Sequence, residues 1–277
     1  MKIVDVKRVG AAHLTVLDRQ QRNRRNAAAK AMRHVLGQQW ILAGMLRTQL
    51  WAVGRGKAGT AGLALHPVWV QQCMGKELLV QVPLARIGYF MADWLQLGSR
   101  RVHTSDFFLA HGDLAPARQD IGRLNVLQEV QDLMAVDWDF RRTPAYAHMV
   151  DALGRQCPVV RQQVRLDTVD KVDGYFLRFH ALYQSVKSHG LLSNLEVSQR
   201  LCEPADREIG IALDRDGSLV KLQGGQHRFA LAVALGLEKV PVELRMVHAQ
   251  ALVETCRQHS CSPVQAIERL LQNLCCG

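Results

Sequence analysis

The sequence lacks acidic residues over one long stretch near its N-terminus. Residues 19–76 hold ten lysines and arginines but no aspartate or glutamate, and the formal net charge of the 277-residue chain is +10. Residues 77–277 hold 22 basic and 23 acidic residues and are nearly neutral. The whole excess of positive charge therefore lies in one stretch, which predicts a separate role for it.

Other absences narrow the class of protein. No apolar run reaches 18 residues, since Arg47 interrupts the best candidate, so no membrane-spanning helix is expected. The first ten residues alternate in charge and contain no apolar core, so no signal peptide is predicted. The seven cysteines form no Cys-x-x-Cys pair, which favours free thiols and a cytoplasmic protein. With 48% hydrophobic and 22% charged residues, the chain is expected to be globular.

The basic stretch is predicted to be mainly helical. Residues 19–34 are rich in alanine and long polar side chains, which favour helix, and residues 35–53 continue the pattern. Residues 54–62, GRGKAGTAG, lack the Gly-Lys-Ser/Thr order of a phosphate loop and are interpreted as a flexible linker. Residues 1–62 are thus predicted to form a basic arm that ends in a glycine-rich linker.

Three roles remain open for this arm, which offers residues 19–57 to a partner. The first is contact with nucleic-acid phosphates through Arg19, Arg22, Arg24, Arg25, Lys30 and Arg33. An anionic membrane surface is the second partner, bound through an apolar face of Trp40, Ile41, Leu46, Leu50 and Trp51. The third role is packing on its own body or on another protein. Few aromatic residues lie between the basic ones, which argues against a platform for single-stranded nucleic acid.

The rest of the chain predicts an α/β (α+β) fold with a small mixed sheet. Strands are predicted at 78–82, 208–214, 218–223 and 240–247, with a hairpin turn at 215–217. Helices are predicted at 121–135, 144–153, 175–189 and 226–235, and from Ser262 onward. Thr143-Pro144 provides an N-cap and a proline at the first helical position, and Ser262 with Gln265 forms a capping box.

Residues 219–244 carry the pattern that bears on chemistry: strand, double glycine, helix, strand. Glycines allow the backbone to come close to a ligand, and the first turn of a helix presents N–H groups and a dipole that favour an anion. His227 and Arg228 add side-chain donors at the same end. The segment therefore predicts a small phosphate cradle, with a plain strand-to-helix turn as the alternative.

The stretch GGQHRFALAVALGLEKVPV resembles the signature of the ParB/sulfiredoxin superfamily. That signature is a Gly-x-His-Arg box, a helix of small residues, Leu-Gly and Val-Pro-Val. The helix at 182–192, the hairpin at 208–225 and VPLARI at 82–87 resemble further family elements, in the family's order. The resemblance implies a ParB/sulfiredoxin-like nucleotide-binding domain at 77–248, a helical insertion at about 100–170 and C-terminal helices at 249–277.

In the family, the box and the upstream helix bind nucleotide phosphates. The resemblance implies ATP or CTP with magnesium as the ligand and phosphotransfer or nucleotide hydrolysis as the activity, without identifying a catalytic residue. The implied binding residues are Gly224, Gly225, Gln226, His227, Arg228 and Ser185, and Arg178 shares the helix face of Ser185. The alternative function is a non-catalytic module tethered by the basic arm to nucleic acid or an anionic membrane.

Two departures limit the resemblance. Sulfiredoxins carry their reactive cysteine where this sequence has Gln226, and a glutamine amide cannot form the thiosulfinate intermediate, so sulfiredoxin activity is not expected. Partition proteins have a helix-turn-helix domain after the nucleotide domain, and only about 30 residues follow Val247 here, enough for two short helices.

Two weaker sets of residues complete the candidates. Asp113, Asp137 and Asp139 are candidate magnesium ligands beside a nucleotide, with turn-forming or surface roles as the alternative. Cys256, His259 and Cys261 fit no standard zinc spacing, so no metal site is predicted from them.

Overall fold

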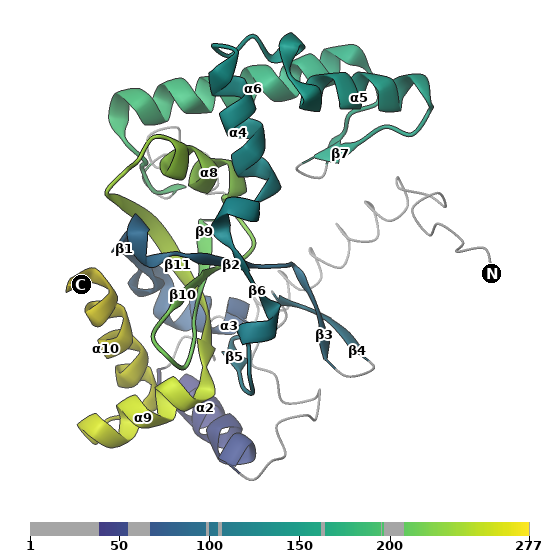
Figure 1. Ribbon diagram of the computed structural model, residues 1–277. Coiled ribbons are helices and arrows are strands. Elements are labelled where there is room, and N and C mark those ends of the chain that lie inside the picture. Colours follow the sequence, from purple (N-terminus) through teal and green to yellow (C-terminus); the bar gives the residue numbers. More distant parts are fainter. Residues whose placement is uncertain are drawn as a thin grey trace.

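A computed structural model describes residues 39–54, 67–97, 100–104, 107–161, 164–194, 196 and 208–276. Residues 1–38 of the predicted arm at 1–62, and residues 55–62 of its linker, lie outside these ranges. Within them the protein is an α/β structure with a mixed sheet, as expected from the sequence (Figure 1). None of the described helices is both long and apolar enough to cross a membrane.

The main sheet has seven strands in the order β1-β11-β9-β10-β2-β6, with β5 paired to the end of β11. Its strands are β1 (Leu79–Pro83), β2 (Tyr89–Met91), β5 (Leu109–Ala110), β6 (Arg118–Asp120), β9 (Ile209–Leu213), β10 (Leu219–Lys221) and β11 (Lys239–His248). The central pair β9 and β11 is parallel, whereas β1 and β10 run antiparallel to their neighbours β11 and β9. Two small hairpins lie outside this sheet, formed by β3 (Trp94–Leu97) with β4 (Arg100–His103) and by β7 (Val160–Arg161) with β8 (Val164–Arg165).

The α-helices that the structure describes are α2 (Gln39–Gly54), α3 (Pro67–Met74), α4 (Asn125–Ala135), α5 (Pro144–Gly154), α6 (Val169–His189), α8 (Gln226–Ala234), α9 (Ala249–His259) and α10 (Pro263–Cys276). Short 3₁₀ turns are η1 (Gly75–Leu78), η2 (Leu84–Arg86), η4 (Ala115–Ala117), η5 (Ile121–Arg123) and η6 (Phe140–Arg142). In Figure 1, α6 and α8 lie at one end of the sheet and α2, α9 and α10 at the other.

Local signals for helix ends are confirmed. The Thr143 hydroxyl accepts a hydrogen bond from the backbone N–H of Tyr146 at 3.2 Å, and Pro144 is the first residue of α5. The Ser262 N–H donates to the Gln265 side chain at 3.0 Å, and the Gln265 N–H donates to the Ser262 hydroxyl at 3.4 Å, which forms the predicted capping box. Helix α6 begins six residues before the predicted start at 175, because Thr168 caps it by accepting from a backbone N–H of the first turn.

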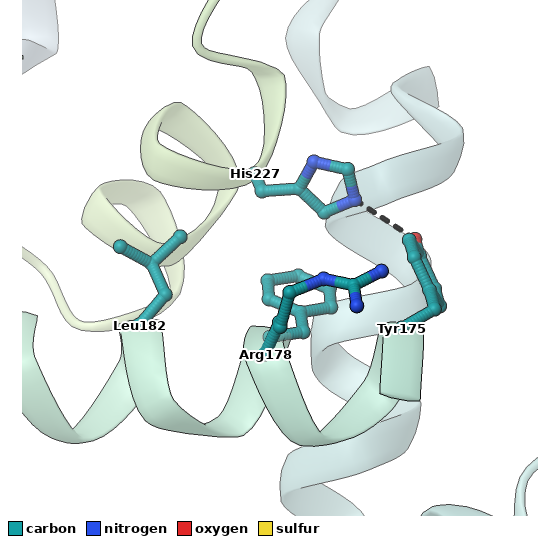
Figure 2. Close-up of a pocket in the computed structure, with 5 residues that line it drawn as sticks. Tyr175, Arg178, Leu182 and His227 are labelled. Atoms are coloured by element: carbon teal, nitrogen blue, oxygen red, sulfur yellow. Dashed lines mark hydrogen bonds between the residues drawn. The ribbon is translucent and has the colours of Figure 1, made fainter. Parts of the chain in front are cut away.

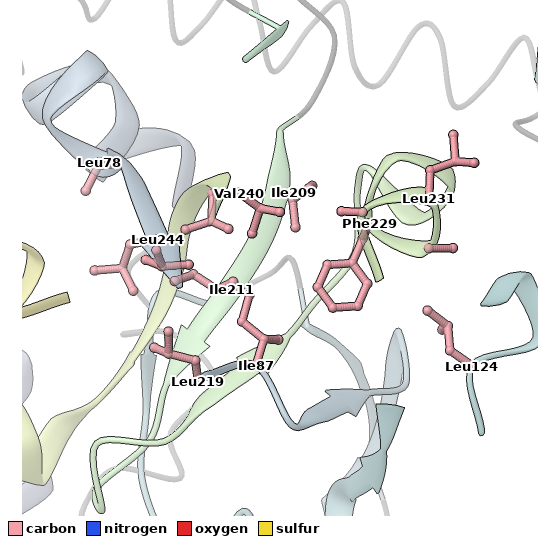
Figure 3. Close-up of a cluster of buried hydrophobic side chains, with 14 of the residues drawn as sticks. Leu78, Ile87, Leu124, Ile209, Ile211, Leu219, Phe229, Leu231, Val240 and Leu244 are labelled. Carbon is pink, nitrogen blue, oxygen red and sulfur yellow. The ribbon is translucent and has the colours of Figure 1, made fainter. Parts of the chain in front are cut away.

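The hydrophobic core joins the sheet to helices on both sides. Ile209 and Ile211 of β9 face Phe229 of α8, and Leu244 of β11 lies in the same cluster (Figure 3). Helix α2, part of the predicted arm, inserts its buried leucines into this core and packs against α10. The segments predicted as separate units, at 1–62, 77–248 and 249–277, therefore share one buried cluster where the structure describes them.

The predicted insertion at about 100–170 is not purely helical. It supplies β6, which pairs with β2 at the edge of the main sheet, and β5, which pairs with β11. Its helix α4 packs directly against α8. The insertion is thus built into the sheet and reaches the helix that carries the Gly-x-His-Arg box.

Candidate phosphate-binding site

The double glycine connects β10 to α8 in a left-handed backbone conformation. Gly224 has φ +90° and Gly225 has φ +58°, which glycine adopts without steric cost. A Cβ atom on Gly225 would lie 2.7 Å from Cγ1 of Ile209, and one on Gly224 would lie 2.7 Å from the carbonyl oxygen of Glu208. The glycines therefore allow the loop to pack tightly against the start of β9. This packing differs from the predicted role of the glycines, which is to let the backbone come close to a ligand.

Two cationic side chains fasten this loop. The Arg245 guanidinium donates to the carbonyl oxygens of Gln223 at 2.7 Å and Glu208 at 3.0 Å. The buried Lys221 ammonium donates to the carbonyl oxygen of Gly224 at 2.9 Å and also to that of Leu222. Burial, and secondly the charge of Arg245, lowers the pKa of Lys221 to about 7. The entry to α8 is therefore held by internal bonds on the side of the sheet.

Arg228 has partners that differ from those expected for a phosphate ligand. Its side chain is buried, and it donates to the carboxylate of Glu208 at 2.8 Å and to the carbonyl oxygen of Leu192. These bonds tie the first turn of α8 to the start of β9 and to the segment that follows α6. Arg228 is thus engaged in holding the site together.

His227 lies against α6 in a chain of buried polar groups. The hydroxyl of Tyr175 donates to Glu129 of α4 at 2.8 Å and lies 2.8 Å from Nε2 of His227. Because the hydroxyl has one proton, this arrangement assigns the imidazole proton to Nε2, which donates to the tyrosine oxygen. Glu129 and Tyr175 are both buried.

Burial shifts the pKa of each group in this chain. It lowers the pKa of His227 to about 4, with a further contribution from the positive charge of Arg161. It also raises the pKa of Glu129 and of Tyr175, and the Glu129 carboxylate adds to the effect on Tyr175. His227 is therefore neutral at pH 7 and contributes hydrogen bonds to the site rather than charge.

A small pocket with a cavity volume of about 40 Å³ lies between α6 and the start of α8. It is lined by Tyr175, Arg178, Phe179, Leu182 and His227 (Figure 2). Two of the predicted site residues, Arg178 and His227, thus come from separate helices to the same pocket. In the part of the chain that the structure describes, Arg178 has no acidic partner and makes no hydrogen bond.

The remaining predicted residues lie outside the pocket lining. Gln226 is the half-buried first residue of α8, and Gly224 and Gly225 lie behind it against the sheet. Ser185 is exposed on α6, two turns beyond Arg178 on the same helix face, about 10 Å away along the helix axis. The structure therefore brings Arg178 and His227 together and leaves Ser185 at the rim.

Sequence reasoning missed Glu129, Tyr175 and Arg161. Tyr175 stands at the predicted start of the amphipathic helix, but nothing in the sequence pairs it with a carboxylate in the insertion. For the weaker sets, the described residues contain no group of three or more His, Cys, Asp or Glu side chains arranged to hold a metal ion. Asp113 instead accepts from the backbone N–H of Ala115 at 3.1 Å.

Only the geometry of the site and the sequence resemblance bear on its role. Comparison of the chain with protein-family models, characterised proteins and solved structures finds no significant match.

Proposed function

We propose that the protein binds the phosphate groups of a nucleoside triphosphate, ATP or CTP, at the pocket between α6 and the start of α8. One observation carries the proposal. The guanidinium of Arg178 lines a pocket next to the first turn of α8 and has no carboxylate partner among the described residues. A guanidinium forms paired, charge-assisted hydrogen bonds with phosphate oxygens.

The start of α8 supports an anion at the same place. Its N-cap residue is Gly225, so no side chain caps the helix. The first N–H groups of a helix have no partner within the helix, and its dipole favours negative charge there. The resemblance to the ParB/sulfiredoxin superfamily, in which this box binds phosphates, supports the assignment through His227, the residue of the box that lines the pocket.

The size of the pocket limits what it holds. Sites for whole small molecules usually measure about 300–1,000 Å³, and the cavity volume here is about 40 Å³. A volume of this size holds at most one phosphate group, and the rest of the nucleotide would extend out of the pocket along α6 toward Ser185. Magnesium would arrive with the nucleotide and keep mainly phosphate and water ligands, since the described residues offer no cluster of carboxylates.

Isothermal titration calorimetry with ATP and CTP in the presence of magnesium tests the proposal. Arg178→Ala should weaken binding by about 10- to 150-fold, the equivalent of about 1.5–3 kcal/mol for a charged hydrogen bond. Lys187→Ala is the matched control, because it removes an exposed positive charge from the same helix outside the pocket lining. The proposal is refuted if neither ATP nor CTP binds at millimolar concentration.

The chemistry that follows binding is a separate measurement. A phosphotransferase consumes nucleotide in step with an acceptor, a hydrolase consumes it without one, and a nucleotide-controlled binding module does not consume it. Sulfiredoxin chemistry is not proposed, because Gln226 stands at the position of the reactive cysteine. We also propose a cytoplasmic location, supported by the free thiols of the described cysteines and testable by cell fractionation.

A further inference from the structure

Helix α2 has one side in the core and the other in solvent. Leu42 and Leu46 are fully buried and face the helices α3, α9 and α10. At 100° per residue, Trp40, Arg47 and Trp51 fall within about 40° of one another, on the side opposite to the leucines. The buried leucines fix the rotation of the helix, so the opposite side must point outward.

The outward side presents two large aromatic side chains. Trp40 is 70% exposed and Trp51 is 55% exposed. They are separated by three helical turns, about 16 Å along the axis, with the exposed Arg47 between them. We call Trp40, Arg47 and Trp51 the tryptophan face of α2.

The sequence around this face carries charge of a single sign. Helix α2 contains no acidic residue, and it lies within residues 19–76, which hold ten basic residues and no acid. The exposed tryptophans suit a surface that has an apolar layer within reach. The basic residues of the same segment suit a surface that carries negative charge.

We propose that the tryptophan face of α2 docks the protein on an anionic membrane surface. Indole rings prefer the boundary between headgroups and hydrocarbon, where the ring is apolar and the N–H meets polar groups. Basic side chains close to anionic lipids add electrostatic attraction. Protein and double-stranded DNA partners lack this combined boundary of hydrocarbon and negative headgroups, so the lipid surface is the better match.

The position of α2 fits a docked protein that keeps its site accessible. Helix α2 lies at the opposite end of the molecule from α6 and α8, the helices that line the pocket (Figure 1). A membrane beneath α2 would leave the pocket open to water. The inference is independent of the proposed function, because it uses a different surface and a different ligand.

Sedimentation of the full chain with vesicles tests the proposal. Vesicles of phosphatidylcholine with about one-third phosphatidylserine should bind the protein, and pure phosphatidylcholine vesicles should bind it at least about tenfold more weakly. The double variant Trp40→Ser/Trp51→Ser should lose about tenfold or more in binding to the anionic vesicles, because two indoles no longer reach the interface. Trp94→Ser is the matched control, since it removes a half-exposed tryptophan from the β3–β4 hairpin.

A second readout separates docking from a change in stability. Lipids brominated near the headgroup should quench the tryptophan fluorescence of the wild type and not that of the double variant. Unchanged vesicle binding by the double variant overturns the proposal. The proposal is also overturned if the double substitution weakens binding to duplex DNA and leaves vesicle binding unchanged. It is overturned as well if the wild type is a dimer that the double substitution dissociates. Either result would assign the face to another partner.

Discussion

The sharpest test of the site concerns Arg228, which the sequence suggested as a phosphate ligand. Its guanidinium is paired with Glu208 at 2.8 Å, and both side chains are about 90% buried. Arg228→Met keeps most of the side-chain volume but leaves the buried carboxylate without this guanidinium. Breaking one half of a buried ion pair typically costs about 3–5 kcal/mol. We expect a loss of about 3 kcal/mol, because the remaining exposure of both groups eases the desolvation.

Urea unfolding followed by circular dichroism measures this loss. The added substitution Glu208→Gln should recover about 1–2 kcal/mol in the Arg228→Met background, because it removes the negative charge that had faced the guanidinium. Calorimetry of the folded single variant should give a nucleotide affinity within about twofold of the wild type. A stability loss below about 1 kcal/mol, together with a large loss of nucleotide affinity, would contradict the assignment and return Arg228 to the ligand site.

Three further outcomes are expected. Gly225→Ala should cost at least about 2 kcal/mol of unfolding free energy, since its Cβ would meet the backbone of Ile209, whereas Gly236→Ala, with φ +63° and open space, should cost only about 1–2 kcal/mol of backbone strain. His227 stays neutral in the fold down to pH about 4 but takes up a proton near pH 6.5 when unfolded, so its contribution to stability is present above pH 6.5 and is lost as the pH falls. Between pH 7 and pH 5, the free energy of unfolding should therefore fall by up to about 2 kcal/mol more in the wild type than in His227→Gln, as measured by urea unfolding. Ser262→Ala should lower the thermal stability by the equivalent of about 1 kcal/mol, through loss of the cap of α10.

The elements that the sequence predicted well are those set by short-range chemistry. The β9–β10 hairpin follows from Asp216-Gly217 in the turn, and α5 and α10 begin where Thr143 and Ser262 cap them. In each case the deciding contact lies within a few residues of the chain. The start of α6 was missed because Val169 and Val172 weaken the helical pattern, whereas the cap at Thr168 and the burial of Val172 decide the boundary.

The partners within the site were not accessible from the sequence. Glu129 and Tyr175 are 46 residues apart, and Tyr175 and His227 are 52 residues apart. Only the packing of α4 and α6 around α8 brings them together. The same holds for Arg228. Its positive charge predicts a negatively charged partner, but the sequence does not show that this partner is Glu208 within the same protein.

Early and late segments of the chain pack against each other, and this constrains how the protein folds during synthesis. Strand β1 adds to the sheet through β11, from Leu79 opposite Glu243, and α2 packs against α10. The ribosome releases β1 and α2 long before their partners exist, and closing such a large loop slows folding. Until α10 emerges, Leu42 and Leu46 have no completed core to enter, so the nascent N-terminal half is where chaperones would be expected to bind.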